Sequence, residues 1–217
     1  MSEITDILSS TFLLDFLRGM TINFEIAGIS LLLGLVAGAV LTIARLQGGV
    51  TGGFAAAIVE LMRAAPTFVV MFFLLNALPN GGGLSGTMTV ALSLVPYAAS
   101  YVADSGVDAV SHLRAGSHLG FYLVLPNIAR AFFVLVMSSS AGAAIGVPEG
   151  IAVILRQAAH LPTIGQKLAL FAVGIVCFGV PLQLGFAIVR AIQRKLGTME
   201  SSGGRVGSRI LLFDKKR

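Results

Sequence analysis

The segment that decides the fold reads Glu60-Leu61-Met62-Arg63-Ala64-Ala65-Pro66. It places an acid, a base and a proline in a region that is otherwise apolar enough to lie in a membrane. A charged side chain near the centre of a bilayer costs roughly 3 to 17 kcal/mol, so ionisable groups in such segments face protein, a water-filled cavity or the membrane edge. This segment is therefore the first indication of function.

The composition of the whole chain indicates its class. Of its 217 residues, 56% are hydrophobic and 12% are charged, against about 25% charged in soluble domains. The mean hydropathy is +0.91. We expect an all-α polytopic membrane protein with about five transmembrane helices, because five stretches approach the roughly 20 apolar residues that a span needs. They lie near Ile22–Ile43, Phe54–Leu78, Met88–Ala103, Leu119–Val147 and Leu168–Ile188.

The expected spans divide the chain into three parts. Residues 1–20 form an amino-terminal surface segment, residues 21–195 the transmembrane domain, and residues 196–217 a basic cytoplasmic tail. Weak attraction of this tail to anionic membrane lipid and disorder are equally favoured. Five spans leave too little chain for a separate soluble domain, and the sequence has no P-loop. We therefore expect no cofactor in this chain, and any ATP would be bound by partner subunits.

The distribution of basic residues predicts the orientation in the membrane. If the amino terminus is outside, all but three of the 15 Lys and Arg residues lie in inner segments or at the inner boundary, and the exceptions are Arg18, Arg156 and Lys167. The positive-inside rule then predicts a multi-pass protein of the cell inner (plasma) membrane with a cytoplasmic carboxyl terminus. Topology explains the net charge of +5, so we expect no nucleic-acid binding.

The opening segment combines an ion pair with a backbone break. Glu60 and Arg63 are three residues apart, so on a helix they share a face and neutralise each other near the inner boundary. We favour this pairing over direct contact with a substrate. Pro66 removes a backbone donor, which predicts a kink or break that would act as a hinge.

A second group of polar residues predicts a substrate pathway. Tyr97, Tyr101 and Asp104 follow a four-then-three spacing on one helical face, which suits a polar stripe that lines a cavity between helices. Asn76 and Ser100 are further candidates for this pathway. The alternative is a helix interface satisfied by hydrogen bonds, and the sequence favours neither.

The first expected span carries two more signals. Asn23 and Glu25, near its outer end, would contact a substrate delivered from outside, although Glu25 would also reach water there. Gly34 and Gly38 are four residues apart, a spacing typical of close contact between membrane helices.

Several short motifs follow one another in a fixed order. Glu60–Pro66 is followed by the phenylalanine-rich run Thr67–Phe73. Around this pair lie the segments Gly19–Ile22, Tyr97–Asp104, Leu123–Arg130 and Ile145–Glu149. In composition and order these motifs resemble those of permease subunits of binding-protein-dependent ABC transporters for polar amino acids. The similarity extends from about Gly19 to Lys195.

The resemblance implies an importer subunit that has no ATPase site of its own. Two permease subunits, identical or homologous, would form the pathway between them. ATP-binding cassette subunits would drive it, and an extracytoplasmic solute-binding protein would deliver the cargo. The stretch Ser105–Val124 would couple to the ATPase, but it is shorter than in the family and its motif diverges. The candidate coupling residues are Asp108, Ala109, His112, Leu113 and Arg114.

Two other classes of function stay open. A non-transporting membrane scaffold, or a regulatory pseudo-permease, would explain the shortened coupling stretch. An intramembrane enzyme is less favoured, because Asp104 and Asp108 form the only close carboxylate pair and no nucleophile or metal-ligand cluster accompanies them. His112 and His118 are six residues apart and do not share a helical face, so we expect no metal site.

Overall fold

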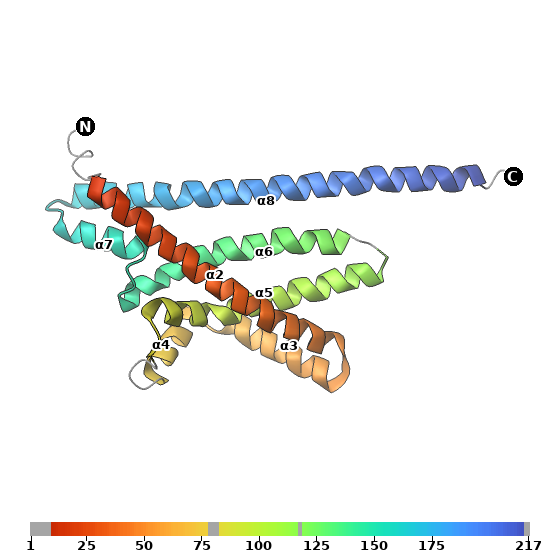
Figure 1. Ribbon diagram of the computed structural model, residues 1–217, viewed down its shortest axis with the longest axis horizontal. Helices are drawn as coiled ribbons and strands as arrows, with labels where there is room; N and C mark the ends of the chain where they lie inside the picture. Colours follow the sequence, from red (N-terminus) through yellow and green to blue (C-terminus); the bar gives the residue numbers. More distant parts are fainter. Residues whose placement is uncertain (1–9, 78–82, 117–118, 215–217) are drawn as a thin grey trace.

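The computed structural model describes residues 10–77, 83–116 and 119–214, and nearly all of them are helical. Figure 1 shows α2, α5, α6 and α8 as long helices, and α2, α5 and α8 end toward the same side. The elements are α2 (Ser10–Leu46), α3 (Gly49–Ala64), α4 (Thr67–Ala77), α5 (Gly86–Arg114), α6 (Leu119–Ser138), the 3-10 helix η2 (Ser139–Ile145), α7 (Gly150–His160) and α8 (Ile164–Asp214).

The number of membrane-spanning helices agrees with the sequence. Within the described residues, four stretches are long and apolar enough to cross a membrane, and they lie in α2, in α5, in α6 with η2, and in α8. The pair formed by α3 and α4 makes a fifth span if the two helices are counted together. The expected all-α polytopic membrane fold is therefore confirmed.

The second expected span, Phe54–Leu78, is broken in the middle. Helices α3 and α4 are bent by 95° relative to each other. Ala65 has extended backbone angles, φ −70° and ψ 116°, because the ring of Pro66 disfavours a helical residue before it. The chain becomes helical again at Thr67. Pro66 thus produces the break that the sequence predicts, and Leu78 lies outside the described residues.

Helices α2 and α5 pack so closely that larger residues would not fit between them. A methyl group added to Gly34 would lie 2.4 Å from the Cβ of Ala98. One added to Gly38 would lie 2.6 Å from the Cβ of Val102. Both distances are shorter than any tolerated carbon contact, so the predicted small-residue contact is confirmed and its partner helix is α5.

Hydroxyl groups reinforce the same contact. The buried Ser30 hydroxyl lies 3.0 Å from the Ala91 carbonyl of α5, and the Thr42 hydroxyl lies 3.4 Å from the Ala103 carbonyl. Each hydroxyl also reaches a carbonyl one turn back on α2. In lipid, which offers no competing hydrogen bonds, such contacts add directly to helix association.

Two expected boundaries lie inside helices. Residues 10–20, expected as part of a surface segment, continue the first span, because their aromatic side chains recur every four residues and have a surface to pack on. Helix α8 likewise continues past residue 195 to Asp214, through most of the expected tail. The first part of α2 packs in an apolar cluster with α7 and α8. Its members are Phe12, Phe16, Met20, Val153, Ile154, Ala158 and Leu170.

Replacing Gly38 with leucine should separate α2 from α5. Overpacking a close contact costs typically 1 to 3 kcal/mol, so the unfolding midpoint in mild detergent should fall clearly. Gly28→Leu is the matched control, since a methyl group added at Gly28 meets no atom within 4 Å. Equal stability of the two variants would contradict the contact.

Candidate functional site

A network of four charged side chains joins three helices. Asp104 of α5 accepts a hydrogen bond from Arg45 of α2 at 2.6 Å and a second one from Arg63 of α3. Arg63 also lies 3.3 Å from Glu60, one turn earlier on α3. The expected pair of Glu60 with Arg63 is therefore present, but Arg63 is shared with Asp104.

The four charges of this network cancel. Two arginines face two carboxylates, and the side chains of Arg45 and Asp104 are about one quarter and one third exposed. Paired charges of this kind are tolerated at membrane depth, whereas a single unpaired charge is not. The network therefore fixes α2, α3 and α5 to one another at the level of Asp104.

The expected pathway residues lie partly together. Tyr97 and Tyr101 are half-buried, and their ring centroids are 6.3 Å apart on the face of α5 that leads to Asp104. Ser100 is buried, and its hydroxyl donates to the Tyr97 carbonyl at 2.8 Å. Asn76 lies exposed on α4, where its amide donates to the Phe72 carbonyl. No hydrogen bond among the described residues joins Asn76 to the others, and the role of all five in a pathway stays a prediction.

The expected coupling residues occupy the last turns of α5 rather than a separate loop. Ala109 is buried, and the side chains of Asp108, His112, Leu113 and Arg114 are exposed. The helix ends at Arg114 and the chain turns at Gly116, whose φ of 79° is left-handed. The partner of His112 in the metal-site argument, His118, lies outside the described residues. The described residues contain no group of three or more potential metal ligands.

A buried polar cluster that the sequence did not predict lies around Asn23, in the first half of α2. Asn23 is fully buried, and its amide donates to Ser139 at 2.8 Å and to Glu149 at 2.9 Å. In return, the Gly150 N–H donates to the Asn23 side-chain oxygen at 3.0 Å. These bonds fasten α2 to η2 and to the start of α7. Because Asn23 is buried among protein groups, it joins helices here and does not face outward to contact a substrate, as the sequence suggested.

Glu149 is the central member of this cluster. Its carboxylate accepts hydrogen bonds from the N–H groups of Ile151 and Ala152, so it caps the amino terminus of α7. Burial raises the pKa of this carboxyl group above its ordinary value, although the hydrogen bonds from the backbone and from Asn23 act in the opposite direction. The acid directly before an amphipathic helix was the signal in the sequence that would have indicated this cap.

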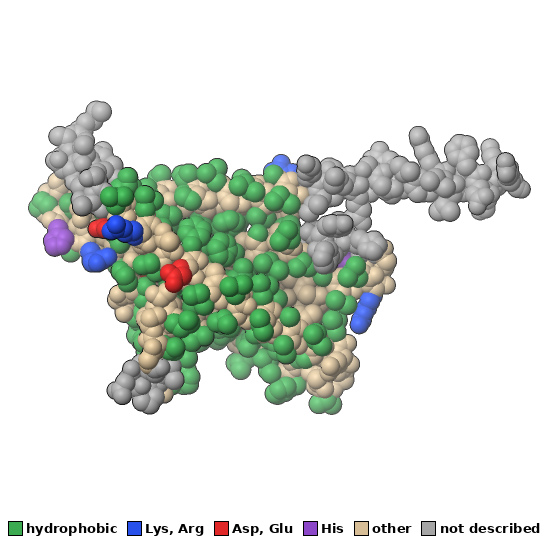
Figure 2. All heavy atoms as spheres, in the orientation of Figure 1, with side chains coloured by type: hydrophobic (Ala, Val, Ile, Leu, Met, Phe, Trp, Pro, Cys, Tyr) green, Lys and Arg blue, Asp and Glu red, His purple; other side chains and the backbone are tan. Residues whose placement is uncertain are grey.

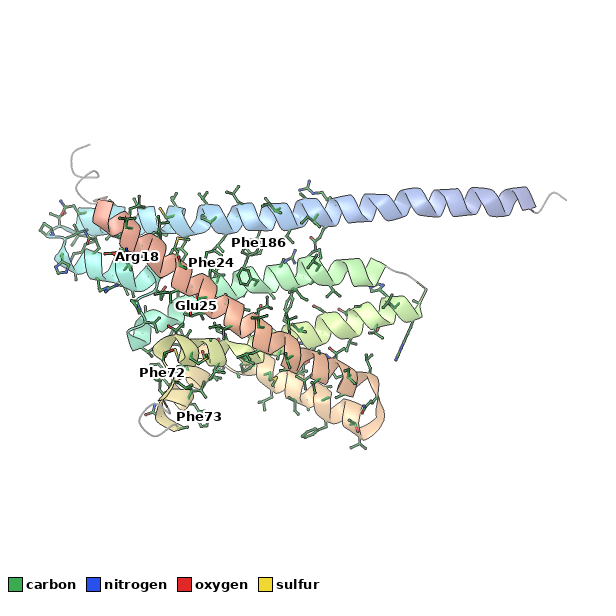
Figure 3. All side chains as sticks on the ribbon, viewed as in Figure 1. Arg18, Phe24, Glu25, Phe72, Phe73 and Phe186 are labelled. Carbon is green, nitrogen blue, oxygen red and sulfur yellow. The ribbon has the colours of Figure 1, made fainter. Side chains whose placement is uncertain are left out.

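The surface is mostly apolar, and its few charges are separated. Figure 2 shows hydrophobic side chains over most of one face, with charged groups mainly near the two ends. Glu25 is an exception, because it lies exposed on α2 two turns after Arg18 (Figure 3). Neither a hydrogen bond nor an ion pair joins Glu25 to another described residue. Phe72 and Phe73 extend the exposed apolar surface on α4 (Figure 3).

Comparison with known proteins finds solved structures that share the fold of this chain. No protein-family model and no curated protein sequence matches the chain. A chain from the crystal structure of an amino acid ABC transporter with histidines superposes with a TM-score of 0.67 and 14% identity, covering 86% of this chain and 96% of that one. A chain from the MetNI methionine ABC transporter in an inward-facing conformation gives 0.58 and 20% identity, covering 85% and 99%.

This chain has the fold of an ABC importer permease. The likeness covers nearly the whole of both compared chains and most of this one. Sequence identity is too low to transfer individual residues. The shared fold nevertheless agrees with the resemblance that the order of the motifs indicates.

Replacing Asp104 with asparagine should leave Arg45 and Arg63 without a counter-charge. Loss of charge-assisted hydrogen bonds costs about 1.5 to 3 kcal/mol, so we expect the free energy of unfolding in detergent to fall by that order. Asp108→Asn is the matched control, one turn further along α5, where the exposed carboxylate has no described partner. A double-mutant cycle with Arg63→Gln measures the coupling, and additive effects would contradict a shared network.

The raised pKa of Glu149 predicts a specific dependence of stability on pH. Because the folded state holds the proton more tightly than the unfolded state, the stabilisation is complete below the ordinary pKa of 4.5 and is lost as the pH rises through the folded value. Glu149→Gln cannot titrate and should lack this part of the profile. Chemical unfolding of both proteins over that pH range measures it, and identical profiles would contradict the assignment.

Proposed function

We propose that this chain is the transmembrane permease subunit of an ATP-driven ABC importer. The observation that carries the proposal is the permease fold, shared over most of the chain and over almost all of the two compared chains. The chain supplies no nucleotide site, since its sequence has no P-loop. It would form the translocation pathway with a second permease subunit, identical or homologous, and depend on ATP-binding cassette subunits for energy.

Helix α5 connects the two parts of the site that such a subunit needs. Its last turns expose Leu113 and Arg114, and its middle carries Tyr97, Tyr101 and Asp104. From Arg114 to Tyr97 the helix has no proline, and it rises about 25 Å at 1.5 Å per residue. A displacement of the exposed end by an ATPase would therefore reach the tyrosines as a rigid movement.

The orientation and the cargo follow from separate arguments. The basic residues favour a cytoplasmic position for the end of α5 and an external position for α7. An extracytoplasmic solute-binding protein would then dock near α7. The motif order and the amino acid transporter among the compared structures support polar amino acids as the cargo.

One observation favours a second candidate function. Helix α5 continues to Arg114, and only residues 115–118 separate it from α6. So short a connection offers an ATPase less surface than a separate coupling helix would. A regulatory pseudo-permease, which occupies a permease position without being driven by ATP, would have no need of that surface.

Reconstitution with the cognate ATPase and binding protein distinguishes the two functions. A permease should give ATP-dependent uptake of a polar amino acid into vesicles. Leu113 is 42% exposed at the end of α5, so Leu113→Asp should lower both uptake and stimulated ATP hydrolysis at least about tenfold by disturbing an apolar contact.

The control variant carries the same change on the same side of the molecule. Val50 is 92% exposed in the first turn of α3, and Val50→Asp should leave uptake unchanged. Absence of uptake from the wild-type complex, with ATPase subunits bound, would overturn the permease function and favour the pseudo-permease.

A further inference from the structure

An apolar groove separates the first half of α8 from its neighbours. It has a volume of about 320 Å³ and opens toward the surroundings of the helix bundle. Among the described residues that line it, Ser140 alone has a polar side chain. The apolar walls come from three helices, with Phe171, Phe178 and Leu182 on α8, Ile151 and Ile154 on α7, and Met137 on α6.

The dimensions of the groove select among occupants. Phe171 and Leu182 are separated by a rise of about 16 Å along α8. This is close to half of a hydrocarbon core of about 30 Å, the depth of one leaflet. The groove is apolar over this length and open along one side, which suits a single extended hydrocarbon chain.

The groove has a basic group at one end. Lys167 precedes Phe171 by one turn on the same face of α8 and is half-buried. Lys167 forms no ion pair with a described residue. Its cation is therefore available to a negatively charged group whose hydrocarbon part lies in the groove.

We infer that this groove binds one acyl chain of an anionic phospholipid, with the phosphate at Lys167 and the chain running along α8 toward Leu182. The bound lipid fills the space between α8 and the helices α6 and α7, and so stabilises the position of α8. The inference does not rest on the transport function, because it uses only the groove, its position within the apolar part of α8 and its basic end.

Native mass spectrometry of the purified full chain tests the site. In the presence of equal amounts of phosphatidylglycerol and phosphatidylcholine, we expect one tightly held lipid and at least a fivefold preference for phosphatidylglycerol. Gly179 lines the groove, and a methyl group added there meets no atom within 4 Å. Gly179→Leu should therefore fill the groove without a clash and lower retention of phosphatidylglycerol at least tenfold.

Two further variants separate the acyl chain from the headgroup. Gly165 lies in the first turn of α8, outside the groove lining and equally open, so Gly165→Leu should retain the lipid as the wild type does. Lys167→Gln should lower the preference for phosphatidylglycerol at least threefold while lipid still binds. Retention of phosphatidylglycerol by Gly179→Leu at the wild-type level would overturn the inference.

A fluorescence experiment keeps the inference testable if Gly179→Leu fails to fold. The sequence contains no tryptophan, so Phe171→Trp places a single reporter in the groove. Phosphatidylglycerol brominated on its acyl chain should quench this reporter with saturation at a low mole fraction. Leu168→Trp, on an exposed position of the same helix, should be quenched in proportion to the mole fraction. Equal, unsaturated quenching of both reporters would overturn the inference.

Discussion

The close approach of α2 to α5 determines where the polar groups of the bundle meet. With glycine at positions 34 and 38, the two backbones come near enough for the hydroxyls of Ser30 and Thr42 to reach carbonyls of α5. Close approach also brings Arg45, at the end of α2, within hydrogen-bond distance of Asp104. Larger residues at the two glycines would move the helices apart and leave these groups facing lipid, where no water replaces the lost partners.

Polar groups fasten α2 at two levels, and the two sets have different chemistry. In the first half of α2, Asn23 and Glu149 form a fully buried set of hydrogen bonds that also begins α7. At the last turn of α2, Arg45 joins Asp104 and Arg63 in a partly exposed set of charges. The buried set suits a fixed joint, because every partner is specified by geometry. The charged set joins three helices rather than two, because Asp104 receives hydrogen bonds from both α2 and α3.

The sequence predicted those features that depend on residues close together in the chain. The apolar stretches predicted the helices, the spacing of Glu60 and Arg63 predicted their ion pair, and Pro66 predicted the break. The partners of Asp104 were not predictable, because Arg45 and Arg63 lie 59 and 41 residues away. Residues 1–20 read as a surface segment because apolar residues alternate with acids as in a short amphipathic helix, yet Phe12, Phe16 and Met20 are buried against α7 and α8. The pathway and coupling roles of the α5 residues stay predictions.

The two prolines of the central helices define which parts move together under the proposed function. Pro66 separates α3 from α4, so α3 is tied to α5 through Arg63 while α4 packs on α5 separately through the fully buried Met71. Pro96 lies within α5 just beyond Tyr97 and deletes one hydrogen bond of the helix. The stretch from Tyr97 to Arg114, with α3 and the end of α2, is therefore one rigid unit bounded by a proline on either side. Movement applied at Leu113 would be concentrated at these two prolines, because a helix bends where its backbone bonds are missing.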